Sequence, residues 1–224
     1  MEKQEIKHFE NNELRTFGRR HGKKLSLRKQ WLMDNVLPKI NPYTTDCSKK
    51  PILLEIGFGN GEHLRDLALN NQDAIIIGAE PFINGVAALL SAITNESDNT
   101  ILNEYKNIRV HADDVRIMLH STNFKSVRFS QIWVLHPDPW PKAKHEKRRL
   151  LNCDFLNFLS NYLANDGKII IGTDHWEYYD WIVEQLKQTE LKIKSTSLET
   201  IKTRYQLKNK AGTSNPKYLI LSKY

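Results

Sequence analysis

The sequence has few cysteines and no long apolar run. Its two cysteines, Cys47 and Cys153, lie far apart among 224 residues, and neither has another cysteine or a histidine at the spacing of a metal site. We therefore expect reduced thiols and no metal centre. Apolar runs such as residues 75–77 fall far short of the roughly 20 residues that cross a bilayer. The start of the chain, MEKQEIKHFENNEL, lacks the apolar stretch of a secretory signal. These absences predict a cytoplasmic protein without a membrane-spanning helix.

The positive charge is concentrated in three stretches. The formal net charge is +7, and residues 15–29, 142–149 and 202–217 contribute +7, +4 and +5, so the remainder carries −9 (7 minus 16). Basic segments on an acidic body are typical of polyanion binding, because each neutralised phosphate releases condensed counterions. The alternative for any one stretch is a solvated loop. A nucleic-acid partner is favoured if all three flank one site.

The chain from residue 51 onward has the pattern of one α/β domain. Short apolar runs alternate with amphipathic stretches of helical length, which predicts parallel strands with crossover helices. Strands are expected at 51–57, 74–80, 107–113, 129–136 and 168–174, and helices near 61–71, 83–95, 115–121, 148–164 and 175–189. Two later strands, 191–197 and 218–224, predict a hairpin with a basic insertion. The expected fold is Rossmann-like, with a seven-stranded, mostly parallel sheet, a C-terminal antiparallel hairpin and helices on both faces. Residues 1–50 are predicted as a basic N-terminal extension with one helix near 27–37, and 51–224 as the α/β domain.

A glycine-rich turn and a series of acids predict a nucleoside pocket. Gly57, Gly59 and Gly61 follow the first strand, where glycine lets a ligand approach the backbone and the helix N-terminus. The spacing G-x-G-x-G differs from the G-x-G-x-x-G of dinucleotide sites, which argues against a nicotinamide oxidoreductase. Glu80 ends the second strand, placed for ribose hydroxyls, and Asp113 or Asp114 ends the third, placed for an adenine amine. An adenosine pocket without a phosphate-binding motif predicts S-adenosylmethionine as the cofactor, with Glu55 adding negative charge near the turn.

Acids also end the fourth and fifth strands. Asp138 follows the fourth strand and should face the reactive end of the cofactor, in a segment stiffened by prolines at 137, 139 and 141. Trp140 offers a face for a base, or packs as core. The basic edge that follows would anchor phosphates; it consists of Lys142, Lys144, His145, Lys147, Arg148 and Arg149. Asp174 ends the fifth strand, where it accepts from a guanine edge or caps the next helix.

Five segments together resemble the bacterial tRNA (guanine-N7)-methyltransferase family, which are class I S-adenosylmethionine-dependent enzymes. They are FGRRHGKKLS, LEIGFGNGEHL, GAEPFINGV, PDPWPKAKHEKRRL and GTDHWEYYDW. The resemblance implies methyl transfer to N7 of the guanosine at position 46, in the tRNA variable loop, by a cytoplasmic monomer or homodimer without an obligate protein partner. It implies cofactor contacts at Glu55, Glu80, Asp114 and Asp138, with Asp114 chosen over Asp113 by alignment. It implies substrate contacts at Lys142, Asp174, Thr203, Arg204, Tyr205 and Gln206.

Two residues depart from that family's pattern, and two other functions stay open. Gln206 stands where the family usually has Glu, and His136 where an aromatic or aliphatic residue is more usual. Guanine N7 carries a lone pair at neutral pH, so no general base is needed, and Asp138 is the expected catalytic residue, orienting the guanine and balancing its developing charge. The alternatives are an RNA exocyclic-amine methyltransferase, because Asp138-Pro-Trp140 resembles an amine-binding loop, and a non-catalytic RNA-binding module on a methyltransferase fold.

Overall fold

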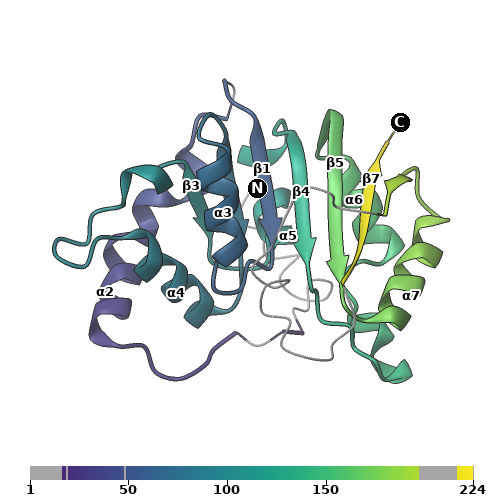
Figure 1. Ribbon diagram of the computed structural model, residues 1–224, viewed down its shortest axis with the longest axis horizontal. Helices are drawn as coiled ribbons and strands as arrows, with labels where there is room; N and C mark the ends of the chain where they lie inside the picture. Colours follow the sequence, from purple (N-terminus) through teal and green to yellow (C-terminus); the bar gives the residue numbers. More distant parts are fainter. Residues whose placement is uncertain (1–16, 19, 48, 197–215, 224) are drawn as a thin grey trace.

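The centre of the molecule is a seven-stranded sheet in the order β3-β2-β1-β4-β5-β7-β6 (Figure 1). The computed structural model describes residues 17–18, 20–47, 49–196 and 216–223. The strands are β1 (Ile52–Ile56), β2 (Ile75–Ala79), β3 (Ile108–His111), β4 (Phe129–Leu135), β5 (Leu163–Thr173), β6 (Lys192–Ser195) and β7 (Lys217–Ser222). Strands β1 to β5 are parallel, and β7 is antiparallel to both β5 and β6. The predicted sheet and its C-terminal hairpin are confirmed.

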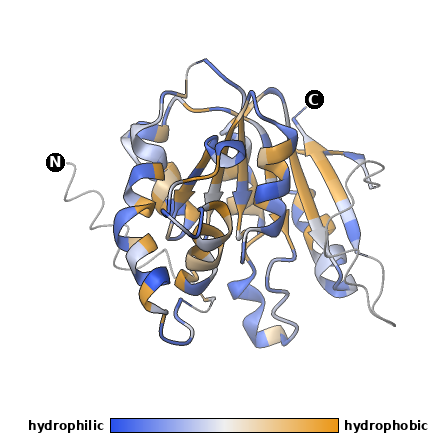
Figure 2. Ribbon diagram, turned by 60° about the vertical axis from the view of Figure 1, so that its left-hand side comes forward, coloured by the Kyte–Doolittle hydropathy of each residue, from blue (hydrophilic) through white to orange (hydrophobic). Residues whose placement is uncertain are grey.

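In the described ranges, three α-helices lie on each face of this sheet. On one face lie α2 (Leu27–Asn35), α3 (Glu62–Asn70) and α4 (Ile83–Ile93), and on the other α5 (Val115–His120), α6 (Cys153–Ser160) and α7 (Trp176–Leu186). Side chains of a strand alternate between the two faces of the sheet. Leu53 therefore belongs to the hydrophobic cluster that includes α2, α3 and α4, whereas Leu54 and Ile56 belong to the one that includes α5, α6 and α7. All five residues of β1 are buried, and all but Glu55 are apolar, as expected for a strand covered on both faces. Figure 2 shows mainly hydrophobic strands flanked by helices in which hydrophilic and hydrophobic residues alternate.

The segment between β4 and β5 differs from the prediction. The prediction of one helix over 148–164 is wrong. A 3-10 helix, η5 (Ala143–Arg148), comes first, and the α-helix α6 covers only Cys153–Ser160. The Asn152 side chain accepts a hydrogen bond from the Phe155 amide at 2.9 Å and so sets the start of α6. Strand β5 begins at Leu163, opposite Phe129, with a register irregularity before residue 168. That irregularity places Asn-Asp-Gly, ordinarily a turn sequence, inside a strand.

The N-terminal extension packs onto the sheet domain. Leu32 of α2 and Val36, which caps the end of that helix, belong to the same hydrophobic cluster as residues of α3 and α4. Arg28 donates to Asn99 Oδ1 and Thr94 Oγ1, both at 3.1 Å, so this base of the first basic stretch holds the end of α4. Two 3-10 helices, η1 (Leu37–Ile40) and η2 (Pro42–Thr44), then pack against β3. The domain boundary near residue 50 stays a prediction; the packing shows that the extension contributes to the core.

The outer strands are β3 and β6. Strand β3 is covered by η1 and η2, whereas β6 exposes Lys192 and Lys194. Across the described ranges, no helix has the length and apolar character needed to cross a membrane. The thiols of Cys47 and Cys153 are free, and burial raises the pKa of the Cys47 thiol.

Candidate functional site

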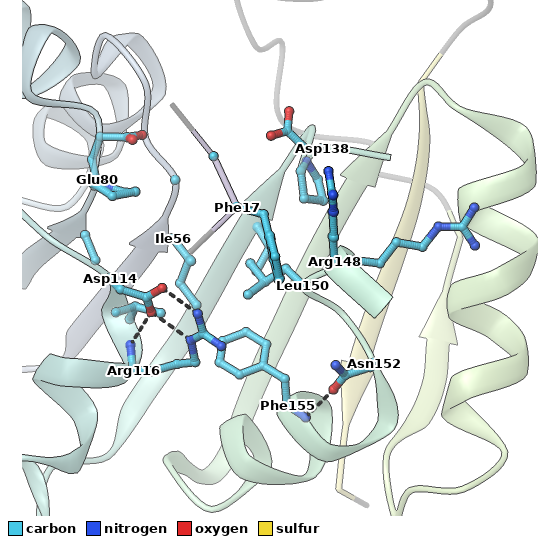
Figure 3. A pocket seen from close by; sticks show the side chains of 18 of the residues that line it. Phe17, Ile56, Glu80, Asp114, Arg116, Asp138, Arg148, Leu150, Asn152 and Phe155 are labelled. Atoms are coloured by element: carbon cyan, nitrogen blue, oxygen red, sulfur yellow. Dashed lines mark hydrogen bonds and ion pairs between the residues drawn. The ribbon is translucent and has the colours of Figure 1, made fainter. Parts of the chain in front are cut away.

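A cavity of about 700 Å³ lies at the carboxyl ends of the parallel strands. Gly57 follows β1, Glu80 follows β2, Asp114 lies beyond β3, and Asp138 follows β4; all four line the cavity. Parallel strands end at one edge of a sheet, and ligands of such folds bind there. Figure 3 shows Glu80, Asp114 and Asp138 around the same space. The structure therefore brings together the acids that the sequence placed at three consecutive strand ends.

The glycine turn has the backbone that only glycine adopts readily. Gly57, Gly59 and Gly61 have φ angles of +74°, +57° and +76°. A Cβ atom at Gly61 would lie 2.6 Å from Leu89 Cδ1 of α4, and one at Gly85 would lie 2.3 Å from the carbonyl oxygen of Gly59. The turn is thus pressed against α4. Gly57 lines the cavity; Gly59 and Gly61 support the turn without lining it.

Glu80 connects the glycine turn to the start of α4. Its Oε2 accepts from the Gly59 amide at 2.7 Å and its Oε1 accepts from the Phe82 amide at 2.8 Å. Burial is the main cause that raises the pKa of Glu80, against the lowering effect of these two hydrogen bonds, and nearby Glu55 and Asp138 raise it further. Each carboxylate oxygen retains a second lone pair, so Glu80 can still accept from a ligand hydroxyl.

Glu55 lies behind the turn, on the α3 side of β1. It is 3% exposed and does not line the cavity. Its Oε2 is 3.2 Å from Nδ1 of His63, whose ring packs 4.8 Å from the Trp133 ring. Within the described residues, Oε2 has no partner with hydrogen-bond geometry. Glu55 therefore places a buried carboxyl group behind the glycine turn, against His63.

Asp114, and not Asp113, lines the cavity. Asp114 caps α5: its Oδ1 accepts from the Arg116 amide and from Arg116 Nε, both at 2.9 Å, and Oδ2 is 2.7 Å from Arg116 Nη2 (Figure 3). Asp113 instead forms an ion pair with Arg20 of the N-terminal extension. Arg116, which the sequence did not single out, therefore fixes the orientation of the Asp114 carboxylate.

The loop after β4 is held by a buried arginine. Arg149 is 4% exposed and donates from Nε to the Pro139 carbonyl at 2.9 Å. Its guanidinium carbon lies 5.5 Å and 5.0 Å from the ring centroids of Tyr178 and Trp181 on α7. The sequence assigned Arg149 to an RNA-binding edge, and this is wrong: burial makes it a structural support of the loop that carries Asp138.

Arg148 points the other way, into the cavity. Its guanidinium carbon lies 5.0 Å from the centroid of the Trp140 ring and 5.3 Å from that of Phe17, and all three residues line the cavity. Figure 3 shows Phe17, in this view, between Glu80 and Asp138. Arg148 Nε is buried and makes no hydrogen bond in the described part of the chain. The cavity therefore contains an unused cationic donor as well as carboxylates. The sequence did not predict that Phe17 lines the cavity, because a single aromatic residue beside a basic stretch does not indicate a binding site.

The remaining predicted substrate residues lie beside the cavity or outside the described residues. Asp174 is half-exposed, and its Oδ1 lies 3.7 Å from His136 Nδ1. Burial lowers the pKa of His136, and Asp174 partly opposes this. The sequence left open that Asp174 caps the next helix, but the residue that caps α7 is His175, whose side chain accepts a hydrogen bond from the Tyr178 amide. Lys142 is exposed at the start of η5 and, like Asp174, does not line the cavity. Thr203, Arg204, Tyr205 and Gln206 fall outside the described residues.

At least one described base from each of the three basic stretches lies at this edge of the sheet. Arg20 pairs with Asp113 next to Asp114, and Arg148 lines the cavity. Lys217 pairs in register with Thr173, one residue before Asp174, and its Nζ lies 3.3 Å from the ring centroid of Trp176. Arg20, Arg148 and Lys217 are far apart in the sequence, yet they lie at the same edge of the sheet. The convergence favours a polyanion bound across the cavity opening.

Comparisons with known proteins agree with this arrangement. A family model described as "Putative methyltransferase" matches residues 49–214. The tRNA (guanine-N(7)-)-methyltransferase of Caulobacter vibrioides is 34% identical over 180 residues, covering 77% of this chain and 76% of that protein. The protein of that name from Neorickettsia sennetsu is 31% identical, covering 87% and 85%. The one from Wolbachia pipientis wMel is 41% identical, covering 63% and 60%.

Solved structures show the same fold at low sequence identity. An antibiotic-related methyltransferase superposes with a TM-score of 0.54 at 14% identity, covering 89% of this chain and 96% of that chain. The 16S rRNA methyltransferase KamB gives a TM-score of 0.54 at 11% identity, covering 78% and 88%. These similarities establish a methyltransferase fold.

Proposed function

The chain belongs to the tRNA (guanine-N7)-methyltransferase family, a family of enzymes, and from that premise we propose that it methylates N7 of a guanosine in the tRNA variable loop. The observation that carries the proposal is the shared cavity: Glu80, Asp114 and Asp138 line one space beside the glycine turn. Acceptors from three strand ends suit a nucleoside. The proposed place of action is the cytoplasm, as a monomer or homodimer.

The residues of the cavity fit S-adenosylmethionine as the methyl donor. Glu80 would accept from the ribose hydroxyls and Asp114 from the adenine amine. Arg148 Nε, buried without a hydrogen-bond partner in the described residues, provides a donor suited to the carboxylate of the amino-acid part. Glu55, which lies behind the glycine turn and does not line the cavity, would add negative charge near the turn. Bound there, S-adenosylmethionine would supply a methyl group from its positively charged sulfur. Once the methyl group is transferred, the remaining sulfur is a neutral thioether.

The chain's own part in the reaction is to position the guanine and balance charge. Because N7 already has a lone pair, no residue needs to remove a proton; the guanine becomes positively charged as the new N–C bond forms. Asp138, on the loop held by Arg149, would orient the guanine and stabilise that charge. Lys142, Asp174 and the segment Thr203 to Gln206 are the proposed substrate contacts, with tRNA phosphates on the three basic stretches.

The test is to locate the methyl group on the RNA. Unmodified tRNA is incubated with the protein and labelled S-adenosylmethionine, digested with nuclease, and analysed by mass spectrometry. We expect one 7-methylguanosine, from the variable loop. Label on an exocyclic amine would instead establish the amine methyltransferase. Absence of transfer, together with calorimetry showing no binding of S-adenosylhomocysteine, would establish a non-catalytic RNA-binding module.

A further inference from the structure

A second cavity lies at the end of the sheet where the parallel strands begin, opposite the first cavity at their carboxyl ends. It measures about 580 Å³ and is formed where β2 and β3 begin, between the strand starts and the end of the N-terminal extension. Its lining residues are Lys39, Thr44, Thr45, Asp46, Lys50, Gln72, Ala74, Ile75, Asn103, Lys106, Asn107 and Arg109. A five-residue strand is about 16 Å long, so this cavity is separate from the one at the carboxyl ends.

The charge of the second cavity is opposite in sign to that of the chain outside the three basic stretches. Four cations line it, Lys39, Lys50, Lys106 and Arg109, against a single acid, Asp46. None of these cations belongs to the three basic stretches. Outside those stretches the chain has 16 bases (33 minus 17) and 25 acids (26 minus 1). Four of 16 bases but one of 25 acids therefore gather at one cavity, which favours an anionic ligand.

Arg109 is a fixed cation in this cavity. Its Nε donates to Thr45 Oγ1 at 2.8 Å, and its Nη1 donates to the carbonyls of Lys106 and Ile108 at 2.8 and 2.7 Å. These bonds hold the half-buried guanidinium in place. No described residue accepts a hydrogen bond from Nη2, which leaves a rigid donor for a ligand. Arginine stays charged at every physiological pH, and phosphate is a preferred partner of its planar donors.

Asn107 adds an acceptor without a partner. Its Nδ2 donates to the carbonyls of Ala68 and Asn71 at 3.2 and 3.0 Å, which fixes the orientation of the amide. Its Oδ1 is buried and has no hydrogen-bond donor among the described residues. Buried polar atoms are ordinarily paired. A ligand for this cavity should therefore carry a donor as well as negative charge.

We propose that the second cavity binds a ribonucleotide through its phosphate. Phosphate oxygens would bind Arg109 and the lysines around it, and a ribose hydroxyl would donate to Asn107 Oδ1. RNA carries both groups in each nucleotide. The ribonucleotide is either part of an RNA backbone or free. The RNA form rests on the proposed function and gives the enzyme a second contact remote from the reacting base; the free-nucleotide form does not depend on that function.

The experiment uses two probes on the full chain. Uridine diphosphate is titrated calorimetrically, with S-adenosylhomocysteine saturating the first cavity. Unmodified tRNA is titrated at several salt concentrations. The variant is Lys39→Glu with Lys106→Glu, because both side chains are exposed and their replacement should leave folding intact. The matched control, which reverses the same number of charges, is Lys192→Glu with Lys194→Glu on β6, where both side chains are also exposed. Arg109→Gln, checked by thermal unfolding, tests the fixed donor separately.

Loss of either probe at the second cavity supports the proposal. We expect uridine diphosphate affinity to fall at least about tenfold, the cost of one charged hydrogen bond, or the slope of log K against log salt for tRNA to fall by about 0.7–0.9 per lost contact. Loss of uridine diphosphate affinity alone identifies a free nucleotide, and loss of the tRNA slope identifies RNA. If neither quantity differs from that of the control with Lys192→Glu and Lys194→Glu, the proposal is wrong. Because both probes measure binding, a protein that fails to methylate tRNA still gives a clear result.

Discussion

Arg149 Nε donates to the carbonyl oxygen of Pro139 at 2.9 Å, which joins the start of the α6 segment to the loop that carries Asp138. The adjacent Arg148 lies between two aromatic rings of the cavity. Two consecutive arginines thus have different surroundings: one stabilises the loop from behind, and the other faces the ligand space.

Replacing Arg149 should destabilise the fold and reduce catalysis together. Arg149→Met leaves the Pro139 carbonyl without its donor and removes the contacts with Tyr178 and Trp181, at a cost of about 2–4 kcal/mol of unfolding free energy. Arg149→Lys, which keeps the charge but reaches fewer carbonyls, should recover part of this. Denaturant unfolding measures the loss. Arg148→Met is the matched control, with unfolding free energy changed by less than about 0.5 kcal/mol but ligand affinity reduced; equal destabilisation by both would contradict the assignment.

Glu80 should make cofactor binding pH-dependent. Burial raises the pKa of Glu80, so as pH falls the carboxylate takes up a proton in the folded protein before an ordinary glutamate would, and it loses acceptor capacity. Affinity for S-adenosylhomocysteine should therefore decline as pH falls from neutral through that raised pKa. In the free protein the sign is opposite: the folded state binds more protons, so this group's contribution to stability is present at low pH and is lost as pH rises through the folded pKa.

The variant Glu80→Gln isolates that titration. It should bind S-adenosylhomocysteine at least about tenfold more weakly, because one hydrogen bond to a charged group is lost, and its affinity should vary less with pH. Glu190→Gln, at an exposed position after α7, should match the wild type. Calorimetry between mildly acidic and neutral pH makes the comparison. A wild-type profile as flat as that of Glu80→Gln would show that Glu80 does not titrate in this range.

Asp138 should affect turnover more than tRNA binding. Asp138→Ala removes the carboxylate proposed to stabilise charge on the guanine, and the loss of one such group lowers kcat by about 100-fold or more. The dissociation constant for tRNA should change little, because phosphates on the basic stretches supply most of the affinity. Asp113→Asn, outside the cavity, should retain most of its kcat. Single-turnover kinetics and filter binding separate the two quantities, and a wild-type kcat in Asp138→Ala would exclude a catalytic role.

Gly85 should tolerate no side chain. A Cβ atom there would lie 2.3 Å from the backbone oxygen of Gly59, and backbone cannot move aside as a flexible side chain does. Gly85→Ala should cost about 1–3 kcal/mol of unfolding free energy and weaken S-adenosylhomocysteine binding by displacing the glycine turn. Gly18→Ala, where nothing lies within 4 Å of the added atom, should be neutral. Thermal unfolding with and without ligand tests both variants.

The fold was predictable because each buried strand carries its own signal. Residues 75–77 are all apolar, so the strand has apolar side chains on both faces. That pattern is expected only in a sheet with both faces covered. The helix expected over 148–164 failed because its apolar residues also suit the extended stretch before Asn152 and the start of β5. The Asn152 cap and the irregular pairing of β4 with β5 depend on partners distant in sequence. Periodicity within one segment does not report such partners.

The site was predictable where a residue's position on a strand end decides its direction. Glu80, Asp114 and Asp138 follow different strands and line the same cavity. Orientation around the strand was less accessible: Glu55 lies on β1 with its side chain behind the turn, against His63. Arg149 was indistinguishable from its basic neighbours in the sequence, since its burial depends on the aromatic side chains of α7.

The lysines of β6 bear on the protein's behaviour in concentrated solution. An uncovered outer strand offers unpaired amides and carbonyls to the same strand of another molecule. Two molecules approaching through β6 would bring Lys192 and Lys194 of each into proximity, and like charges oppose that contact. Neutralising both positions should therefore lower the concentration at which the protein self-associates into ribbons or fibres, without any change at the catalytic edge.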